Sequence, residues 1–213
     1  MSDYIVLENV SKEYKDKLVF RNVSLKLQRG GCYAFTGYNG CGKSVLMKII
    51  CGFVAPTSGK VTIDGKVMGE DIEFIENAGI SINAPDFMNE LTGFENLKIL
   101  ASIQNKITEK DIKKTVHKLK LDEFIDKKVK AYSLGNKQRL RIAQAIMEKP
   151  QILVLDEPMN ALDKSGIKIV REIMQQHIQK GGTIIFTSHN AEDLDALNAT
   201  IFEFDDYELH QVN

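Results

Sequence analysis

The spacing of hydrophobic and polar residues alternates along the chain between a pattern typical of strands and one typical of helices. Short apolar runs predict buried strands, whereas apolar residues three and four positions apart predict amphipathic helices. Strands are expected at Tyr4–Leu7, Leu25–Leu27, Cys32–Thr36, Lys60–Ile63, Ile152–Leu155 and Thr183–Thr187. Helices are expected at Lys43–Cys51, Gln138–Glu148 and Lys164–Gln179. Buried strands that alternate with helices predict an α/β fold with a mostly parallel sheet covered on both faces.

The middle of the chain has a mostly helical pattern and predicts an insert in the α/β domain. Thr108 and Asp111 have the spacing of a helix-capping box, with Asp in the place usually held by Glu. The lysines that follow are interpreted as a solvated helix face rather than a binding surface, because acidic residues lie nearby. We expect a single domain over residues 1–213, with a helical subdomain over about 89–132.

The composition excludes several classes of protein. The chain has 213 residues, with 28 Lys and Arg against 29 Asp and Glu and a formal net charge of −1. This balance argues against binding to nucleic acid through a basic surface, so no nucleic-acid partner is expected. No apolar run approaches the roughly 18 residues that cross a bilayer, and residues 1–10 lack the apolar core of a signal peptide. Three cysteines without a Cys-x-x-Cys pair indicate a reduced, cytoplasmic protein without a zinc site.

A glycine-rich turn lies between a predicted strand and a predicted helix. Residues 37–44 read Gly-Tyr-Asn-Gly-Cys-Gly-Lys-Ser, which fits the phosphate-binding pattern G-x-x-x-x-G-K-[ST]. Glycine permits the sharp turn and the close approach of backbone N–H groups to phosphate oxygens, and the N-terminus of the following helix favours an anion. Lys43 is expected to reach the β- and γ-phosphates, and Ser44 to bind Mg²⁺. The candidate nucleotide-binding residues of this segment are Gly37, Tyr38, Asn39, Gly40, Cys41, Gly42, Lys43, Ser44 and Val45.

Two acidic residues, Asp156 and Glu157, follow the apolar strand Ile152–Leu155. A strand that ends in Asp at the carboxyl edge of a parallel sheet places a carboxylate beside the phosphates. We expect Asp156 to hold the Mg²⁺ shell and Glu157 to orient or deprotonate the attacking water. Adjacent residues of a strand point to opposite sides, so the two carboxylates can take separate roles.

A third segment, Tyr132–Arg139, opens a helix and lies shortly before this acidic pair. With the two motifs above, it makes the chain resemble the ATP-binding subunit of an ABC transporter over essentially its full length. The signature segment of that family is usually Leu-Ser-Gly-Gly-Gln followed by x-Gln-Arg. Ser133, Gly135, Gln138 and Arg139 match it, whereas Leu134 replaces the first glycine and Asn136 replaces the glutamine. A leucine would be strained if that glycine needed a positive φ, so we expect either a negative φ at Leu134 or a shifted loop.

The resemblance implies a fold, a mechanism and partners. The fold would be a P-loop NTPase core with an N-terminal antiparallel β lobe and a helical insert. Two ATP-binding chains, identical or different, would face each other head to tail, with each ATP and its Mg²⁺ between the phosphate loop of one and Ser133, Gly135 and Asn136 of the other. A separate integral membrane permease would be attached, which implies a peripheral position on the cytoplasmic face of the membrane. The Ser-Leu-Gly form of the signature resembles that of exporters of peptides, antibiotics or other drugs.

The resemblance also assigns single residues. Asp163 would support the site across the dimer interface, and His189 would contact the γ-phosphate. Tyr14 would stack on the adenine, with Phe20 as the nearby alternative. Asn83 stands where the family has a glutamine that reaches Mg²⁺, and we expect this shorter side chain to sense the metal site through a water. The adjoining segment 84–88 is expected to form a docking surface for a helix of the partner.

Two other classes share some of these motifs. An ATPase can work without a permease, in translation, DNA repair or cofactor assembly. Only 88 residues separate Ser44 and Ser133, which leaves no room for a repair-type coiled coil, and a single phosphate loop argues against a tandem translation factor. An assembly ATPase stays open at this point. A GTPase or nucleoside kinase is disfavoured, because neither Asn105-Lys106 nor Asn136-Lys137 is followed by the Asp that guanine selection needs.

Overall fold

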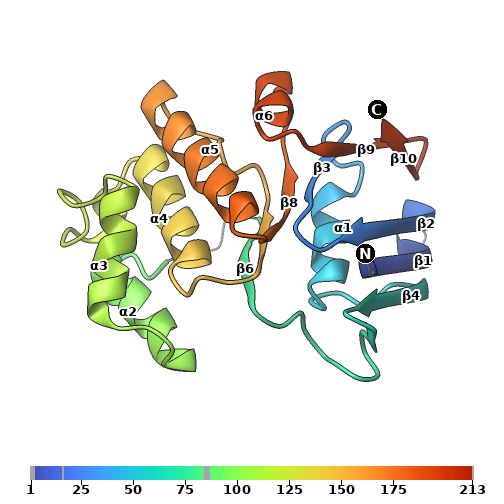
Figure 1. Cartoon of the computed structure of the whole chain (residues 1–213), viewed down its shortest axis with the longest axis horizontal. Helices are drawn as coiled ribbons and strands as arrows, with labels where there is room; N and C mark the ends of the chain where they lie inside the picture. The colour runs from blue at the N-terminus through green and yellow to red at the C-terminus, as the bar shows by residue number, and fades with distance from the viewer. Residues whose placement is uncertain (1–2, 16, 84–86, 213) are drawn as a thin grey trace.

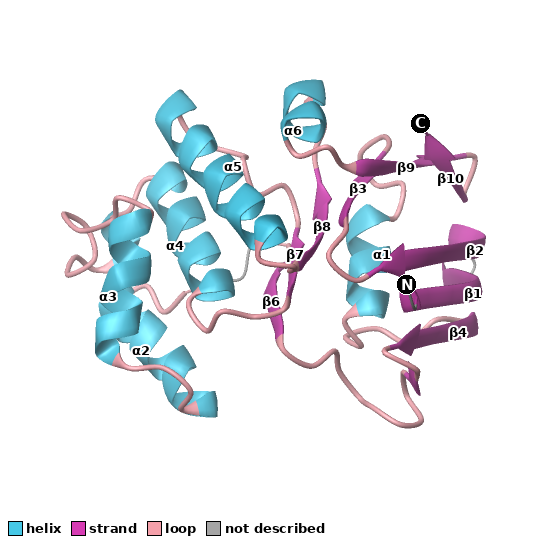
Figure 2. Cartoon of the chain, in the orientation of Figure 1, coloured by secondary structure: helices cyan, strands magenta, loops and turns pink. Residues whose placement is uncertain are grey.

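The computed structural model describes residues 3–15, 17–83 and 87–212. Within them the chain forms two sheets flanked by helices, as Figure 1 shows along the chain and Figure 2 by type of element. The antiparallel sheet and the helices α2 (Gly93–Gln104) and α3 (Glu109–Lys118) lie toward opposite ends of the longest axis, with the middle strands of the second sheet between them. This is the expected α/β fold with an N-terminal β lobe.

The N-terminal sheet is antiparallel. Its strands are β1 (Asp3–Tyr14), β2 (Lys17–Gln28), β4 (Ser58–Ile63) and β5 (Lys66–Val67), in the order β2-β1-β4-β5. The strands β1 and β2 extend well beyond the predicted Tyr4–Leu7 and Leu25–Leu27, because several register shifts in their pairing interrupt the alternation of apolar and polar residues. The turn between β4 and β5 is formed by Asp64 and Gly65, both at positive φ, as expected for a hairpin.

The second sheet is parallel apart from one edge. Its strands are β3 (Cys32–Thr36), β6 (Ala78–Ser81), β7 (Ile152–Leu155), β8 (Thr183–Thr187), β9 (Thr200–Asp205) and β10 (Glu208–Val212), in the order β10-β9-β3-β8-β7-β6. Only β10 runs antiparallel to its neighbour within the part described. The strands β3, β7 and β8 match their predicted ranges, whereas β6, β9 and β10 were not predicted. Residues 202–205 alternate between phenylalanine and an acidic residue, a strand signal in the sequence that could have revealed β9.

Helices cover both faces of this sheet. They are α1 (Lys43–Ile50), α2 (Gly93–Gln104), α3 (Glu109–Lys118), α4 (Leu134–Ile146), α5 (Lys164–Gln179) and α6 (Ala191–Ala196), with a 3₁₀ turn at Val129–Ala131. The predicted helix Gln138–Glu148 begins earlier than expected, because Ser133 caps it. None of these helices, among the residues described, combines the length and the apolar character that a membrane span requires.

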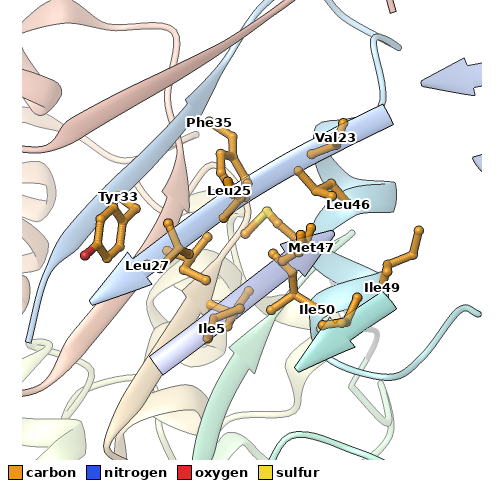
Figure 3. Packing of buried hydrophobic residues seen from close by; sticks show 14 of the residues in the cluster. Ile5, Val23, Leu25, Leu27, Tyr33, Phe35, Leu46, Met47, Ile49 and Ile50 are labelled. Carbon is orange, nitrogen blue, oxygen red and sulfur yellow. The ribbon is translucent and has the colours of Figure 1, made fainter. Parts of the chain in front are cut away.

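The two faces of the central sheet belong to two separate cores. On one face, α1 lies between the two sheets and packs its apolar residues against Ile5, Leu27 and Phe35 (Figure 3). On the other face, α4 and α5 pack on the sheet, α2 and α3 pack against α4, and the core includes alternate residues of the same strands, such as Leu153 and Phe186. Strand β7 contributes Ile152 and Val154 to the first core and Leu153 and Leu155 to the second, which is why the strand is apolar throughout. Packing on both faces holds the parallel strands in place. The candidate site lies at the edge of the sheet where their carboxyl ends meet.

Candidate functional site

The glycine-rich loop joins the end of β3 to the start of α1. Gly37, Gly40 and Gly42 have φ values of 124°, 87° and 113°, which favour glycine. A Cβ on Gly42 would lie 2.9 Å from the Phe20 ring, so a side chain at this position would also clash with the core. Gly42 is the N-cap of α1 and offers no side-chain cap. The first N–H groups of the helix are therefore left for an external anion.

Lys43 lies under this loop with only 6% of its surface exposed. Its Nζ donates to the carbonyl oxygens of Gly37 at 2.8 Å and Tyr38 at 3.0 Å. The loop thus surrounds a single positive charge with its own backbone. The Cys41 side chain is buried in the core, and its Sγ lies 3.8 Å from Lys43 Nζ.

Asp156 connects the phosphate loop to the ends of the parallel strands. Its Oδ2 accepts from Ser44 Oγ at 2.7 Å, and its Oδ1 accepts from Thr187 Oγ1 at 2.8 Å. The backbone N–H of Asn83 donates weakly to Oδ2, at 3.4 Å. A carboxylate beside a hydroxyl is a set of hard oxygen donors, of the kind that holds Mg²⁺ together with waters and phosphate oxygens. Thr187 was not predicted as a site residue, although it ends a buried strand at the same edge as Asp156.

Glu157 is held by a conformation that the strand pattern did not predict. Its φ of 46° is left-handed, so the separation of Asp156 and Glu157 arises from a turn after β7, and the expected strand alternation does not apply. The Glu157 N–H donates to Thr187 Oγ1 at 2.7 Å. One carboxylate oxygen lies 3.3 Å from His189 Nε2, and the other accepts from Asn160 Nδ2 at 2.6 Å. The structure therefore brings Glu157 and His189 together and adds Asn160, which sequence reasoning missed.

Gln138 ties α4 to this turn. It is buried, and its Nε2 donates to the carbonyl oxygens of Glu157 at 3.2 Å and Pro158 at 3.0 Å. These bonds hold the backbone that carries Glu157 in place. The only sequence signal for this role was the match of Gln138 to the signature segment.

A cavity of about 960 Å³ collects most of the predicted residues. Its lining includes Tyr14, Tyr38, Asn39, Gly40, Gly42, Lys43, Ser44, Val45, Asn83, Asp156 and Glu157. Tyr14 is exposed, and the Lys12 ammonium lies 4.6 Å from the centre of its ring. Phe20, the alternative to Tyr14, is wrong, because it is fully buried against Phe204 and cannot contact a ligand.

Asn83 reaches the cavity, but its recorded bond to Asp156 comes from the backbone. Its φ of 52° is left-handed, a conformation that asparagine tolerates. Ala84, Pro85 and Asp86, part of the expected docking segment, lie outside the described residues. Met88, at the end of that segment, is exposed, whereas Phe87 is partly buried.

Of the signature segment, Leu134 and Gln138 belong to the described lining of this cavity. Ser133 is the N-cap of α4, where its Oγ accepts from the Asn136 N–H at 3.2 Å. Leu134 is the first helical residue and does not have a positive φ, so the backbone strain considered for a leucine at this position is absent. Leu134 is 73% exposed. The described residues that line the cavity do not include Ser133, Gly135 or Asn136.

Asp163 also lies apart from the cavity lining described above. Its Oδ1 accepts from the Gly166 N–H at 2.9 Å, which caps α5, and from Arg139 at 2.8 Å. The cap bond, together with Ser165 and Arg139, holds the pKa of Asp163 below its usual value. A role of Asp163 across an interface stays a prediction.

The three cysteines, Cys32, Cys41 and Cys51, are free and buried. Burial raises the pKa of both Cys32 and Cys51 to about 12, so neither offers a thiolate at neutral pH. Across the described ranges, no three His, Cys, Asp or Glu side chains cluster as a metal site.

A phosphate loop after β3, with its lysine under the loop and an acidic pair after β7, two strands away in the same parallel sheet, defines a P-loop nucleoside-triphosphate hydrolase. Comparison with known proteins places the chain within that class. The model of the ABC transporter family matches residues 20–160. The chain therefore belongs to the ABC transporter family, as an ATP-binding subunit that hydrolyses ATP to drive transport.

Individual relatives agree with this assignment. The chain is 41% identical to the uncharacterized ABC transporter ATP-binding protein YybJ of Bacillus subtilis, over 89% of this chain and 87% of YybJ. It is 37% identical to the bacitracin transport ATP-binding protein BcrA of Enterococcus faecalis, over 87% of this chain but only 61% of BcrA. A solved structure of the ATP-binding cassette MJ0796, a dimer bound to ADP and Pi, has a TM-score of 0.86 at 22% identity, over 98% of this chain and 99% of that one.

Proposed function

We propose that two copies of this subunit, or one copy and a similar chain, close over two ATP molecules to drive an exporter. Each ATP would lie between the phosphate loop of one chain and Ser133, Gly135 and Asn136 of the other. The observation that carries this proposal is the division of the site. Lys43, Ser44, Asp156 and Glu157 share one cavity, whereas Ser133, Gly135 and Asn136 of the same chain are not among the described residues that line it.

Hydrolysis would proceed by in-line attack of a water on the γ-phosphorus, with rupture of the bond to ADP. Glu157 would orient this water and accept its proton. Thr187 holds the Glu157 backbone beside the end of β7, and Asn160 holds the carboxylate. Lys43 and the backbone N–H groups of residues 40–44 would balance the negative charge of the transferred group. His189, which now contacts Glu157, would donate to a γ-phosphate oxygen once ATP is bound.

Ser44 and Asp156 would hold Mg²⁺. Their oxygens lie 2.7 Å apart, so both could serve one ion, with the Ser44 hydroxyl turned to offer a lone pair and still protonated. The ion would neutralise charge on the β- and γ-phosphates. Asn83 would contribute through a bridging water, since its side chain is shorter than glutamine and its backbone already contacts Asp156.

A separate permease would complete the transporter. The relatives named for bacitracin and lantibiotic transport support an export role and a position on the cytoplasmic face of a membrane. The helix α2 offers a docking surface, because Ile99 and Ile103 lie one turn apart and are both exposed, with Met88 exposed nearby in sequence. An apolar helix of the permease would cover these three residues.

The variant Glu157→Gln tests the proposed dimer. It removes the base but keeps the shape of the side chain and an oxygen that can accept from Asn160, so hydrolysis should fall at least about 100-fold while ATP still binds. With MgATP the variant should accumulate as a dimer in light scattering, and with MgADP as a monomer. The matched control is Glu123→Gln on the exposed surface of the helical insert, which should keep the rate of the native protein. A variant that stays monomeric with MgATP bound would contradict the shared site.

A further inference from the structure

The turn between β9 and β10 contains an unusual residue. Asp205 pairs with Glu208, so the connection has two residues, Asp206 and Tyr207. Both have positive φ, at 41° and 65°. A two-residue turn of this kind favours Asn and Gly, because a bulky side chain is disfavoured in the left-handed region. A tyrosine kept in such a position indicates a local function for its ring.

The turn is attached to the N-terminal sheet. The backbone N–H of Arg21, on β2, donates to the carbonyl oxygen of Tyr207 at 2.9 Å. The Arg21 guanidinium contacts Glu208 at 3.1 Å and Asp206 at 3.7 Å, on the two sides of Tyr207. Three contacts with Arg21 therefore hold Tyr207 and its two neighbours in position relative to β2.

This attachment places Tyr207 at the nucleotide cavity. Its side chain is part of the cavity lining, together with Tyr14, Leu18 and Val19, and 42% of its surface is exposed. Tyr14 pairs with Lys17 at the start of β2, four residues before Arg21. Four residues of a strand span about 13 Å. Two tyrosine side chains anchored at this separation leave room for a nucleoside between them.

We propose that Tyr207 is a second aromatic residue that binds the base end of the nucleotide, in addition to Tyr14. The proposal rests on the proposed function, since it assumes that Lys43 and Ser44 hold the phosphates of ATP in the same cavity. One face of the Tyr14 ring already carries the Lys12 ammonium, so Tyr14 offers the base only its other face. Tyr207 supplies apolar contact from the C-terminal hairpin, which a stacking residue on β1 alone cannot provide.

The variant Tyr207→Gly is a favourable test because it suits the turn. Glycine relieves the left-handed strain, so the thermal midpoint should not fall. The Kd for MgATP should rise roughly tenfold, as expected for the loss of one aromatic contact with a base. The Kd for inorganic tripolyphosphate, which has no base, should not change. Tyr207→Phe should bind MgATP like the native protein, because it keeps the ring.

Two results would overturn the proposal. An unchanged Kd for MgATP in Tyr207→Gly would show that the ring does not contact the base. An equal loss of MgATP and tripolyphosphate affinity would show that the turn acts on the phosphate loop instead. Failure of the native protein to bind either ligand would count against the proposed function itself. This outcome is distinguishable from failure of the Tyr207 proposal, which concerns only the variant.

A fluorescence experiment gives an independent readout. The chain contains no tryptophan, so Tyr207→Trp introduces a single tryptophan at the cavity, which can be excited selectively at wavelengths where tyrosine does not absorb. Its emission should change on addition of MgATP but not on addition of tripolyphosphate. The matched control is Phe53→Trp, an exposed aromatic position that is not part of the cavity lining described, where neither ligand should have an effect. Emission from the Tyr207→Trp variant that responds equally to both ligands, or to neither, would contradict a base contact.

Discussion

The two halves of the candidate site differ in how the chain holds them. In the phosphate half, Lys43 is buried and Asp156 accepts two side-chain hydrogen bonds, so the geometry is set before any ligand binds. In the signature half, Ser133 is exposed, and its recorded contact is the cap of its own helix. The first half is preorganised for chemistry. In the second half, Ser133, Gly135 and Asn136 lie at the end of a helix and are not among the described residues that line the nucleotide cavity of their own chain. Under the proposed function, a subunit of this kind would carry both halves of a site and need another chain to join them.

The largest effect is expected from Lys43→Ala, which attacks the phosphate half. The change removes the charge at the centre of the loop, so ATP hydrolysis should fall at least about 1,000-fold and ATP binding should weaken. Hydrolysis is measured by phosphate release and binding by calorimetry. A thermal melt serves as control, because two loop carbonyls lose their donor. An unaltered rate would contradict the assignment of the phosphate loop.

A smaller effect on binding, but a strong one on assembly, is expected from Ser133→Asp. Aspartate caps a helix as well as serine does, so the fold should be retained. The added negative charge would face the γ-phosphate held by the other chain and prevent closure. ATP should bind to the monomer with native affinity, while hydrolysis should fall about 100-fold and the ATP-dependent dimer should disappear. Native hydrolysis by this variant would place Ser133 outside the site.

The smallest effect is expected from Thr92→Ala, a matched cap outside the site. Thr92 Oγ1 accepts from the Glu95 N–H at 3.1 Å, much as Ser133 accepts from Asn136. Its loss should cost about 1 kcal/mol, or roughly 2–4 °C in the thermal midpoint, with hydrolysis unchanged. A fall in hydrolysis at constant stability would mean that the helical insert acts in catalysis.

The same cap has a defined pH dependence. The Thr92 N–H donates to the Glu95 carboxylate and lowers its pKa below the usual value. The stabilisation is therefore present above the ordinary pKa of glutamate and is lost as the pH falls through the lowered value. Thr92→Ala retains this N–H, so the variant that removes the bond is Glu95→Ala, and its difference in thermal midpoint from the native protein should shrink in acid.

Much of the phosphate half could be predicted from the sequence, since strand, glycine turn and helix leave little choice for the backbone between Thr36 and Lys43. The pairing of Asp156 with Ser44 followed from the parallel sheet, whose strands end at one edge. The strands β6, β9 and β10 were not predicted, because each contains only short apolar runs.

Other features depend on tertiary contacts that no local pattern encodes. The left-handed turn at Glu157 is supported by Thr187 and Gln138, which are distant in sequence. Tyr207 reaches the cavity through the attachment of its hairpin to β2. The burial of Phe20 depends on its packing against Phe204, so an aromatic residue near the cavity was mistaken for an exposed one.

The most direct measurement mixes two inactive variants. Lys43→Ala keeps an intact signature half, and Ser133→Asp keeps an intact phosphate half. If each site joins halves from two chains, an equal mixture contains heterodimers with one intact site, and about a quarter of the native ATPase rate should return, from random pairing in a two-fold symmetric dimer. A mixture as inactive as either variant alone, with heterodimers demonstrated, would contradict the account.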